Sequence, residues 1–250
     1  MSKTLRSGVK SKPAKSAPSS SKAERLLAGG DESIFRFMKE KLYVAVVCDI
    51  LDSLGYRGQA MHQRLRPLLP DARRCGFAGR ARTVRWLTTD HVAEDDPYGQ
   101  EIEAIDSLRP NDVVVHSTDP TGRCAPWGEL MTTVAMRNGA VGCVCDGMVR
   151  DCVKILALGF PVYHAGIRPL DSKGRARVTD FDVPVACGDV LVRPGEIIFA
   201  DFDGIVVIPK DVEAEVLRLA LEKVVGENVV RAELEAGKSL REVYNTYGIL

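Results

Sequence analysis

The sequence has no net charge, no long apolar run and no C-x-x-C pair, and each absence excludes a class of protein. Its 34 basic residues are balanced by 34 acidic ones, so no overall field recruits nucleic acid or an anionic membrane. No apolar run approaches the roughly 18 residues of a membrane-spanning helix, and no signal-peptide apolar core follows the first residues. The seven cysteines are an odd number without metal-ligand spacing, which favours a reducing compartment. We expect a cytoplasmic protein with no nucleic-acid or membrane partner.

The chain does have the apolar content of a globular protein, preceded by a basic segment. With 250 residues, 45% of them hydrophobic, it can bury one substantial core. Residues 1–29 are rich in Lys, Ser, Pro and Ala and predict a disordered basic tail; an organelle-targeting segment and a basic arm for a partner are the alternatives. Residues 30–250 are predicted to form a single α/β domain that ends in helices.

The apolar pattern predicts alternating strands and helices in the middle of the chain. Strands are expected at 79–87, 112–116, 140–145 and 161–165, and helices at 98–108, 129–137 and 150–158. Because strand-helix-strand units need crossovers, part of the sheet should be parallel. Closely spaced apolar runs at 190–192, 197–199 and 205–208 predict hairpins and a β layer.

Helices are also predicted at both ends of this region. Apolar periodicity indicates a short helix after Ser33 and a second one from Val44 to Leu54. The C-terminal part should form two helices, the last opened by a capping box of Ser239 and Glu242. Valines at 224, 225, 229 and 230 offer more apolar surface than one small domain needs, which predicts a contact between subunits.

Two short stretches carry the candidate chemistry. Gly128-Glu129-Leu130-Met131 precedes Arg150-Asp151, with 20 residues between Glu129 and Arg150. A helix of about ten residues spans about 15 Å, and a strand of about five returns about 16 Å, so both stretches should meet at one edge. Two carboxylates, a guanidinium and free helix N–H groups at that edge suit Mg²⁺ or Mn²⁺ holding a small oxo acid. The alternative is that Asp151 only favours a helix N-terminus and Arg150 is solvated.

These stretches resemble a known family. The arrangement Gly-[Asp/Glu]-x20-Arg-Asp, set in Trp127-Gly128-Glu129-Leu130 and in residues 146–151, is similar to the family named for regulator of ribonuclease activity A. Its catalytic members include 4-hydroxy-4-methyl-2-oxoglutarate/4-carboxy-4-hydroxy-2-oxoadipate aldolases. The similarity runs from about Ser33 to Pro209 and includes the motifs at 159–162, 183–185 and 200–204.

The resemblance implies a fold, an assembly and roles for the site residues. It implies an α/β fold, a layered α/β/β/α sandwich with a mixed, partly parallel sheet, assembled as trimers or hexamers with active sites at subunit boundaries. Asp151 would be the metal ligand, Glu129 would hold a water, and Arg150 would bind the keto or enolate oxygen. Gly128 would permit close approach, and N–H groups around Leu130 and Met131 would hold the carboxylate.

The implied function is a divalent-metal-dependent lyase acting on a 2-oxo acid. It would cleave a 4-hydroxy-2-oxo acid to pyruvate or decarboxylate oxaloacetate through an enolate. A non-enzymatic regulator of a ribonuclease, and a sugar-acid lyase or hydratase on the same scaffold, are the alternatives. Two departures from the aldolase pattern bear on the substrate: Lys154 stands where aldolases often have an acid, and the acidic loop from His91 to Pro97 is either a solvated loop or a lid.

Overall fold

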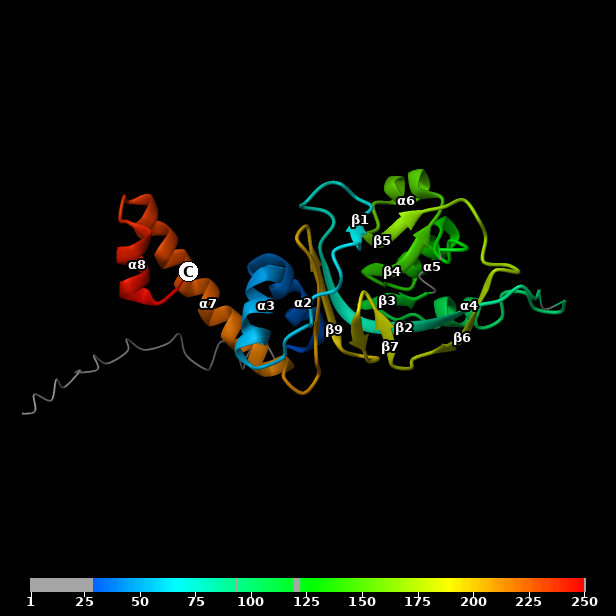
Figure 1. Cartoon of the computed structure of the whole chain (residues 1–250), viewed down its shortest axis with the longest axis horizontal. Coiled ribbons are helices and arrows are strands. Elements are labelled where there is room, and N and C mark those ends of the chain that lie inside the picture. Colours follow the sequence, from blue (N-terminus) through cyan, green and yellow to red (C-terminus); the bar gives the residue numbers. More distant parts are fainter. Residues whose placement is uncertain (1–28, 93, 119–121, 250) are drawn as a thin grey trace, which may run out of the picture.

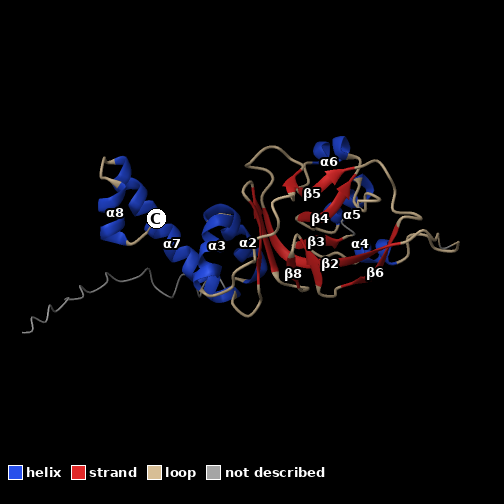
Figure 2. Ribbon diagram, viewed as in Figure 1, coloured by secondary structure: helices blue, strands red, loops and turns tan. Residues whose placement is uncertain are grey.

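The computed structural model describes residues 29–92, 94–118 and 122–249 (Figures 1 and 2), so the predicted tail lies outside the described residues but for its last one. The helices are α2 (Gly30–Lys41), α3 (Val44–Ser53), α4 (Gln100–Asp106), α5 (Glu129–Arg137), α6 (Cys152–Leu158), α7 (Glu213–Glu235) and α8 (Leu240–Tyr247). The strands are β1 (Arg66–Pro67), β2 (Phe77–Thr88), β3 (Asp112–Ser117), β4 (Gly142–Val149), β5 (Val162–Ile167), β6 (Ala176–Phe181), β7 (Val185–Cys187), β8 (Val190–Val192), β9 (Ile197–Asp201) and β10 (Gly204–Ile208).

The main sheet is mixed and partly parallel, as predicted. Its strand order is β1-β5-β4-β3-β2-β9-β10, with β6 paired to the far end of β2. The pairs β2·β3, β3·β4 and β4·β5 are parallel, and the helices α4, α5 and α6 supply the crossovers between them. Strands β9, β10, β6 and β1 are added antiparallel. The carboxyl ends of the parallel strands therefore lie at one edge.

The sheet is strongly curved, because strands from both of its ends contribute to one interior core. Tyr163 of β5, Phe77 of β2 and Val207 of β10 belong to the same buried cluster, which the β7–β8 hairpin completes. On the outside, α4, α5 and α6 cover β3, β4 and β5, whereas α2, α3 and α7 cover β9 and β10. A path through the molecule thus crosses helices, strands, strands and helices, which confirms the predicted layered sandwich.

The two C-terminal helices extend away from the sheet (Figure 1). Helix α7 buries Val216, Leu217 and Ala220 against the helical layer near its start, and its second half packs on α8, which carries the predicted Ser239 capping box. Of the four valines between 224 and 230, Val230 is buried, while Val225 and Val229 are 42% and 46% exposed. Among the described residues, no helix is both long and apolar enough to cross a membrane.

Local features that differ from the sequence predictions include the limits of β4, the start of α6 and strand β6; the short strands β1 and β7 were not predicted either. The strand expected at 140–145 runs from Gly142 to Val149 and contains an irregularity after Cys145. Helix α6 begins at Cys152, so Arg150 and Asp151 precede it instead of forming its first turn. Strand β6 was not predicted, because its half-exposed Ala176–Phe181 segment lacks a continuous apolar run and gains its pairing from the edge of β2.

An ion-pair network joins the helical layer to the sheet. Arg80 on β2 donates to Asp31 of α2 at 2.9 Å and to Glu213 of α7 at 2.6 Å, and its guanidinium lies 5.5 Å from the ring centre of Phe35. The Arg80 side chain is only 22% exposed. Because water screens its charge only in part, its attraction to the two carboxylates is stronger than that of an exposed ion pair. The network fixes the positions of α2 and of the start of α7 against the curved sheet.

We expect Arg80→Ala to lower the free energy of unfolding by about 2 to 3 kcal/mol, between the values for exposed and buried ion pairs, because two part-buried carboxylates lose their partner. Urea denaturation measures the change. Arg218→Ala is the matched control, because Arg218 pairs with two acids on the exposed side of α7 and its loss should change little. Equal losses in the two variants would contradict the structural importance of the Arg80 network.

Candidate active site

The two candidate stretches lie side by side because the chain before α5 pairs with the end of β4. Trp127 forms an isolated parallel bridge with Val149, and the Arg150 N–H donates to the Trp127 carbonyl at 2.9 Å. Glu129 opens α5, while Arg150 and Asp151 follow β4 directly. The structure therefore brings Gly128, Glu129, Arg150 and Asp151 to one edge, as the spacing predicted.

Gly128 is required by close packing. A Cβ at this position would lie 2.8 Å from Asp151 Oδ2 and 3.3 Å from Arg150 Cγ. Its φ of −150° is ordinary extended backbone, so the constraint is space and not conformation. Any larger residue would push the Asp151 carboxylate away from the N-terminus of α5.

Asp151 has a left-handed backbone with φ of 57° at the N-cap of α6. Its carboxylate does not cap its own helix; Oδ2 instead accepts a hydrogen bond from the Glu129 N–H at 3.3 Å. The side chain is 43% exposed. This conformation turns the carboxylate toward the N-terminus of a different helix, where the positive dipole end favours it.

The N-terminus of α5 presents backbone donors beside that carboxylate. The first intrahelical bond runs from Thr132 N–H to the Gly128 carbonyl, so the N–H groups of Leu130 and Met131 have no acceptor four residues earlier in the helix. Leu130 is 75% exposed, and Met131 is partly buried. The Glu129 carboxylate is held over the first turn by a hydrogen bond that Thr133 Oγ1 donates at 3.0 Å.

Arg150 is positioned by a residue far away in the sequence. Its guanidinium forms an ion pair with Asp171 at 3.1 Å and lies 3.9 Å from Asp151. Asp171 also accepts from the Tyr98 hydroxyl and the Ser172 N–H. Burial works to raise the pKa of Asp171, but the Tyr98 hydrogen bond and the Arg150 charge outweigh it and lower that pKa. Asp171 is therefore an ionised anchor for Arg150.

These groups border a cleft of about 330 Å³ between α4, α5 and the end of β4. Glu101 of α4 lines it and is 6% exposed. Burial raises the pKa of Glu101 to about 7, while the hydrogen bond that Ser172 donates at 3.1 Å opposes that rise. The cleft thus combines a cation at one end with a carboxyl group that titrates near neutral pH.

An aromatic cluster supports the loop before Gly128. Trp127 is fully buried, stacks on Phe160 and lies 5.4 Å, between ring centroids, from His116. His116 Nδ1 accepts from Trp86 Nε1 at 2.7 Å, and burial lowers the pKa of His116 to about 3, so this histidine stays neutral. His116 packs in the core beneath the site and has a structural role there.

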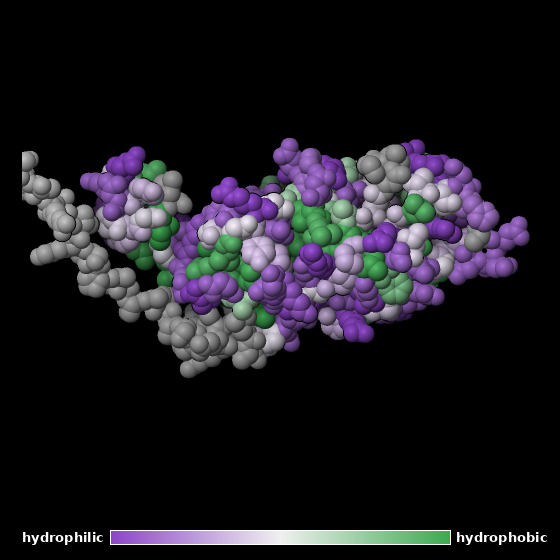
Figure 3. Space-filling view, turned by 60° about the horizontal axis from the view of Figure 1, so that its bottom comes forward, coloured by the Kyte–Doolittle hydropathy of each residue, from purple (hydrophilic) through white to green (hydrophobic). Residues whose placement is uncertain are grey.

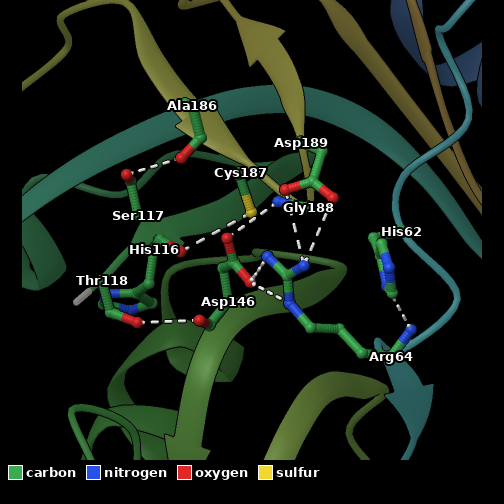
Figure 4. Close-up of polar contacts among 10 residues, drawn as sticks. All are labelled: His62, Arg64, His116, Ser117, Thr118, Asp146, Ala186, Cys187, Gly188 and Asp189. Carbon is green, nitrogen blue, oxygen red and sulfur yellow. Dashed lines mark hydrogen bonds and ion pairs between the residues drawn. The ribbon is translucent and has the colours of Figure 1, made fainter. Parts of the chain in front are cut away.

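The irregular part of β4 is fixed on the opposite face of the sheet (Figure 4). Asp146 accepts from Arg64 at 2.7 Å and from the Gly188 N–H at 2.9 Å, and Thr118 donates to the Asp146 carbonyl. The figure shows Arg64 reaching Asp146 and Asp189 together. These bonds hold β4 to the β7–β8 turn at Asp146, four residues before Arg150. They thereby fix the position of Arg150 at the end of the strand.

The donor set suits a hard cation better than a soft one. The described residues contain no group of three His, Cys, Asp or Glu side chains arranged to hold a metal. Asp151 is one accessible carboxylate, and Mg²⁺ or Mn²⁺, which keep several waters, need only one or two. Burial raises the pKa of the Cys152 thiol, which argues against a thiolate ligand or nucleophile beside it.

Several residues of the site were not predicted. These are Tyr98, just before α4, Glu101 on α4, and Asp171 and Ser172 in the connection between β5 and β6. No local motif marks them, and only the packing of α4 against β6 brings the two segments together. Lys154 lies exposed on α6 and does not line the cleft. The roles assigned to Arg150, Glu129, Asp151, Gly128, Leu130 and Met131 remain predictions.

Comparison with known proteins identifies the class. The model of the RraA-like family, described as Aldolase/RraA, matches residues 44–207, about two thirds of the chain. A solved structure of a protein from Pseudomonas syringae pv. tomato superposes with a TM-score of 0.75 at 25% identity, covering 87% of this chain and 95% of that one. Streptomyces coelicolor RraAS2, described as an unusual member of the RNase ES inhibitor RraA protein family, gives 0.69 at 27% identity, covering 80% and 96%.

The chain belongs to the RraA-like family. Protein DlpA of Legionella pneumophila is 28% identical over 81% of this chain but only 32% of its own length. A protein of Halalkalibacterium halodurans named "Putative 4-hydroxy-4-methyl-2-oxoglutarate aldolase" is 36% identical over 58% of this chain and 65% of its own length. The chain thus spans from a third to just under two thirds of these relatives.

Backbone strain at Asp151 gives a test that does not depend on activity. A left-handed backbone costs alanine about 1 kcal/mol or more and costs glycine little. The free energy of unfolding should therefore be higher for Asp151→Gly than for Asp151→Ala by about 1 kcal/mol. Thermal and urea denaturation measure both variants. At Lys154, inside α6, the same two substitutions should rank in the opposite order, since alanine is the better helix former. An Asp151→Ala variant as stable as Asp151→Gly would contradict the strained conformation.

Proposed function

We propose that this protein is a divalent-metal-dependent carbon-carbon lyase that acts on a small 2-oxo acid. The reaction is retro-aldol cleavage of a 4-hydroxy-2-oxo acid to pyruvate and an aldehyde or oxo acid, or decarboxylation of an oxaloacetate-like acid. The observation that carries the proposal is the meeting of the Asp151 carboxylate, the Arg150 guanidinium and the N-terminus of α5 at one end of a cleft. The aldolase names of relatives support it.

Each residue has a role that follows from its chemistry. Asp151 holds Mg²⁺ or Mn²⁺, which supplies Lewis acidity toward the keto oxygen when bound. The N–H groups of Leu130 and Met131 bind the carboxylate, a use of helix N-termini that Gly128 permits by its small size. Arg150, held in place by Asp171, donates to the oxygen that becomes the enolate.

The proton and electron pair then move between named atoms. Glu129 orients the water that accepts the C4 hydroxyl proton. The C3–C4 bond breaks, its electron pair forms the enolate of pyruvate, and C3 takes up a proton to give pyruvate. Trp127, which precedes Gly128, is fully buried and stacks on Phe160, so the loop at this end of the cleft is anchored in the core.

Two further properties belong to the same proposal. Exposed apolar side chains near the site, Leu130, Ile102 and Val153, and the exposed Val225 and Val229 of α7 support a homo-oligomer, trimer or hexamer. Apolar surface also gathers along the middle of the face drawn in Figure 3. Among the described residues all seven cysteines are free thiols, in keeping with a cytoplasmic location.

Regulation of a ribonuclease is the second candidate function. The likeness to RraAS2, described as a member of an inhibitor family, supports it. A pure regulator has no need of an accessible carboxylate, an anchored arginine and a cleft at one point. Metal-dependent binding of small oxo acids therefore separates the two functions.

We expect purified protein with Mg²⁺ or Mn²⁺ to release pyruvate from 4-hydroxy-2-oxo acids or oxaloacetate, and chelator to abolish the release. Asp151→Asn keeps size and tolerates the left-handed backbone but weakens metal binding, so turnover should fall by about a hundredfold or more. Asp180→Asn, a change of the same kind on exposed β6, is the control and should leave turnover unchanged. Equal activity in both variants contradicts the metal-ligand role.

Arg150→Lys should also reduce turnover, by about a hundredfold, because an ammonium cannot keep the Asp171 contact and the planar contact to the enolate oxygen together. Circular dichroism and denaturation should show an intact fold, since the side chain is 35% exposed. Steady-state kinetics measure the effect. A loss confined to KM would indicate that Arg150 binds the ground state only.

Oxalate tests the enolate chemistry through binding. It is planar and dianionic like the enolate of pyruvate, so it should inhibit competitively and bind more tightly than pyruvate. Titration calorimetry should show oxalate binding with Mg²⁺ and none with chelator or in Asp151→Asn. Oxalate binding that needs no metal, or no binding at any metal concentration, favours the regulator instead.

A further inference from the structure

A polar network within one chain joins the start of α4 to Arg150. Asp171 lies between them: its Oδ1 is 3.1 Å from an Arg150 nitrogen, and its Oδ2 accepts a hydrogen bond from the Tyr98 hydroxyl at 2.7 Å. The next residue, Ser172, donates through its hydroxyl to Glu101, in the first turn of α4, at 3.1 Å. Two adjacent residues of the β5–β6 connection are thus bonded to two residues at the start of α4.

The two oxygens of Asp171 have different partners, and this fixes the plane of the carboxylate. Oδ1 accepts from the Ser172 N–H at 2.8 Å and pairs with Arg150. The last torsion of an aspartate side chain is broad, so contacts at one oxygen leave the other free to rotate. The Tyr98 hydroxyl holds Oδ2 and removes that freedom. The plane of the Asp171 carboxylate therefore depends on Tyr98.

Backbone hydrogen bonds hold both ends of this network. The Asp171 carbonyl accepts from Arg175 at 3.2 Å. The Tyr98 carbonyl accepts from the Glu101 N–H at 2.9 Å, which joins Tyr98 to the first turn of α4. Tyr98 is half-buried and lines the cleft. All of these contacts lie within one chain, so they form whether or not a neighbouring subunit completes the cleft.

Arg150 needs a fixed partner because its side chain is long and 35% exposed. Asp151 Oδ2 lies 3.9 Å from Arg150 Nε, beyond hydrogen-bond distance, so it attracts the charge without fixing its direction. The planar guanidinium takes its direction from the carboxylate to which it is bonded, so a rotation of the Asp171 carboxylate turns Arg150 as well.

We propose that Tyr98 is a positioning residue for Arg150 and that it acts through the carboxylate of Asp171. This role rests on the proposed lyase function and deepens it, because Arg150 is the group that donates to the oxygen of the forming enolate. The negative charge on that oxygen grows toward the transition state, so the contribution of Tyr98 falls on kcat more than on KM.

Chemical modification tests the positioning without an assay of activity. Phenylglyoxal reacts with guanidinium groups, and peptide mass spectrometry gives its rate at Arg150, with Arg73, whose side chain is 94% exposed, as the internal standard. Tyr98→Phe keeps the ring and loses only the hydroxyl, so the rate at Arg150 should rise several-fold. Tyr56→Phe is the matched control, since the Tyr56 hydroxyl donates to Asp211 over the same 2.7 Å away from the cleft. An unchanged rate at Arg150 in Tyr98→Phe overturns the proposal.

A second pair of variants tests Asp171 itself. Asp171→Asn removes the charge that pairs with Arg150 and should raise the rate of modification further. Its matched control is Asp182→Asn, because Asp182 pairs with Arg82 at 2.8 Å and its side chain is 38% exposed, against 30% for Asp171. Asp182 has a positive φ, which asparagine tolerates. An equal rise at Arg150 in Asp182→Asn would show a general loosening of the fold and overturn the role of Asp171.

Steady-state kinetics test the consequence for the reaction. In Tyr98→Phe the kcat of pyruvate release should fall about tenfold with KM nearly unchanged, and in Asp171→Asn kcat should fall about a hundredfold. In an Arg150→Lys background Tyr98→Phe should cause no further loss, because the group through which it acts is gone. A loss confined to KM, or the same loss in both backgrounds, overturns positioning through Arg150.

The two measurements distinguish failure of the positioning role from failure of the lyase function. Faster modification of Arg150 in Tyr98→Phe, in a protein that releases pyruvate from no 2-oxo acid, overturns the lyase function and leaves the positioning of Arg150. Pyruvate release that is equal in Tyr98→Phe and in the parent protein overturns the positioning role and leaves the lyase function.

Discussion

The hydrogen bond from the Arg150 N–H to the Trp127 carbonyl is the constraint on which the site depends. It joins the residue after β4 to the segment before α5, and so sets the stretch at Gly128 beside the stretch at Arg150. Trp127 is immobilised by burial against Phe160 and His116, so the core fixes one partner. The bonds of Asp146 to Arg64 and Gly188 fix the other partner through β4. Groups that are themselves partly exposed are thus held in position by buried ones, as a preorganised site requires.

Much of the fold followed from periodicity, because the central units are regular and their apolar residues face defined cores. The helices opened by Val44 and Glu129 and the strand ending at Ser117 lie within a residue or two of their predicted limits. What periodicity did not predict was β6, whose pairing depends on the edge of β2, and the curvature that brings β5 and β10 to one core. Both are consequences of tertiary packing that no local segment encodes.

The site, like the fold, has a part that the sequence predicts and a part that depends on tertiary packing. The meeting of Glu129 and Arg150 could be predicted because one helix and one strand return the chain over a known distance. The left-handed backbone of Asp151 could not be predicted, because it is stabilised by a hydrogen bond that the N-terminus of another helix donates. Asp171 and Glu101 lack any local signal as well, since each matters only through what α4 and β6 bring near. The residues proposed to carry the chemistry could be predicted from the sequence, but their neighbours Asp171 and Glu101 could not.

The residues around the proposed site come from two parts of the fold that are held in different ways. Arg150 and Asp151 are delivered by β4 and held by the sheet, whereas the distal wall comes from α4 and the outer turns of α5, which pack on the sheet from one side only. Changes in Ile102 or Val134 should therefore alter the cleft without moving the strand that positions Arg150 and Asp151. Asp171 links the two parts, because it anchors Arg150 through a loop that also contacts Tyr98 and, through Ser172, Glu101. A substitution at Asp171 should for that reason loosen Arg150 and the segment before α4 together, whereas one at Val134 should change only the wall of the cleft.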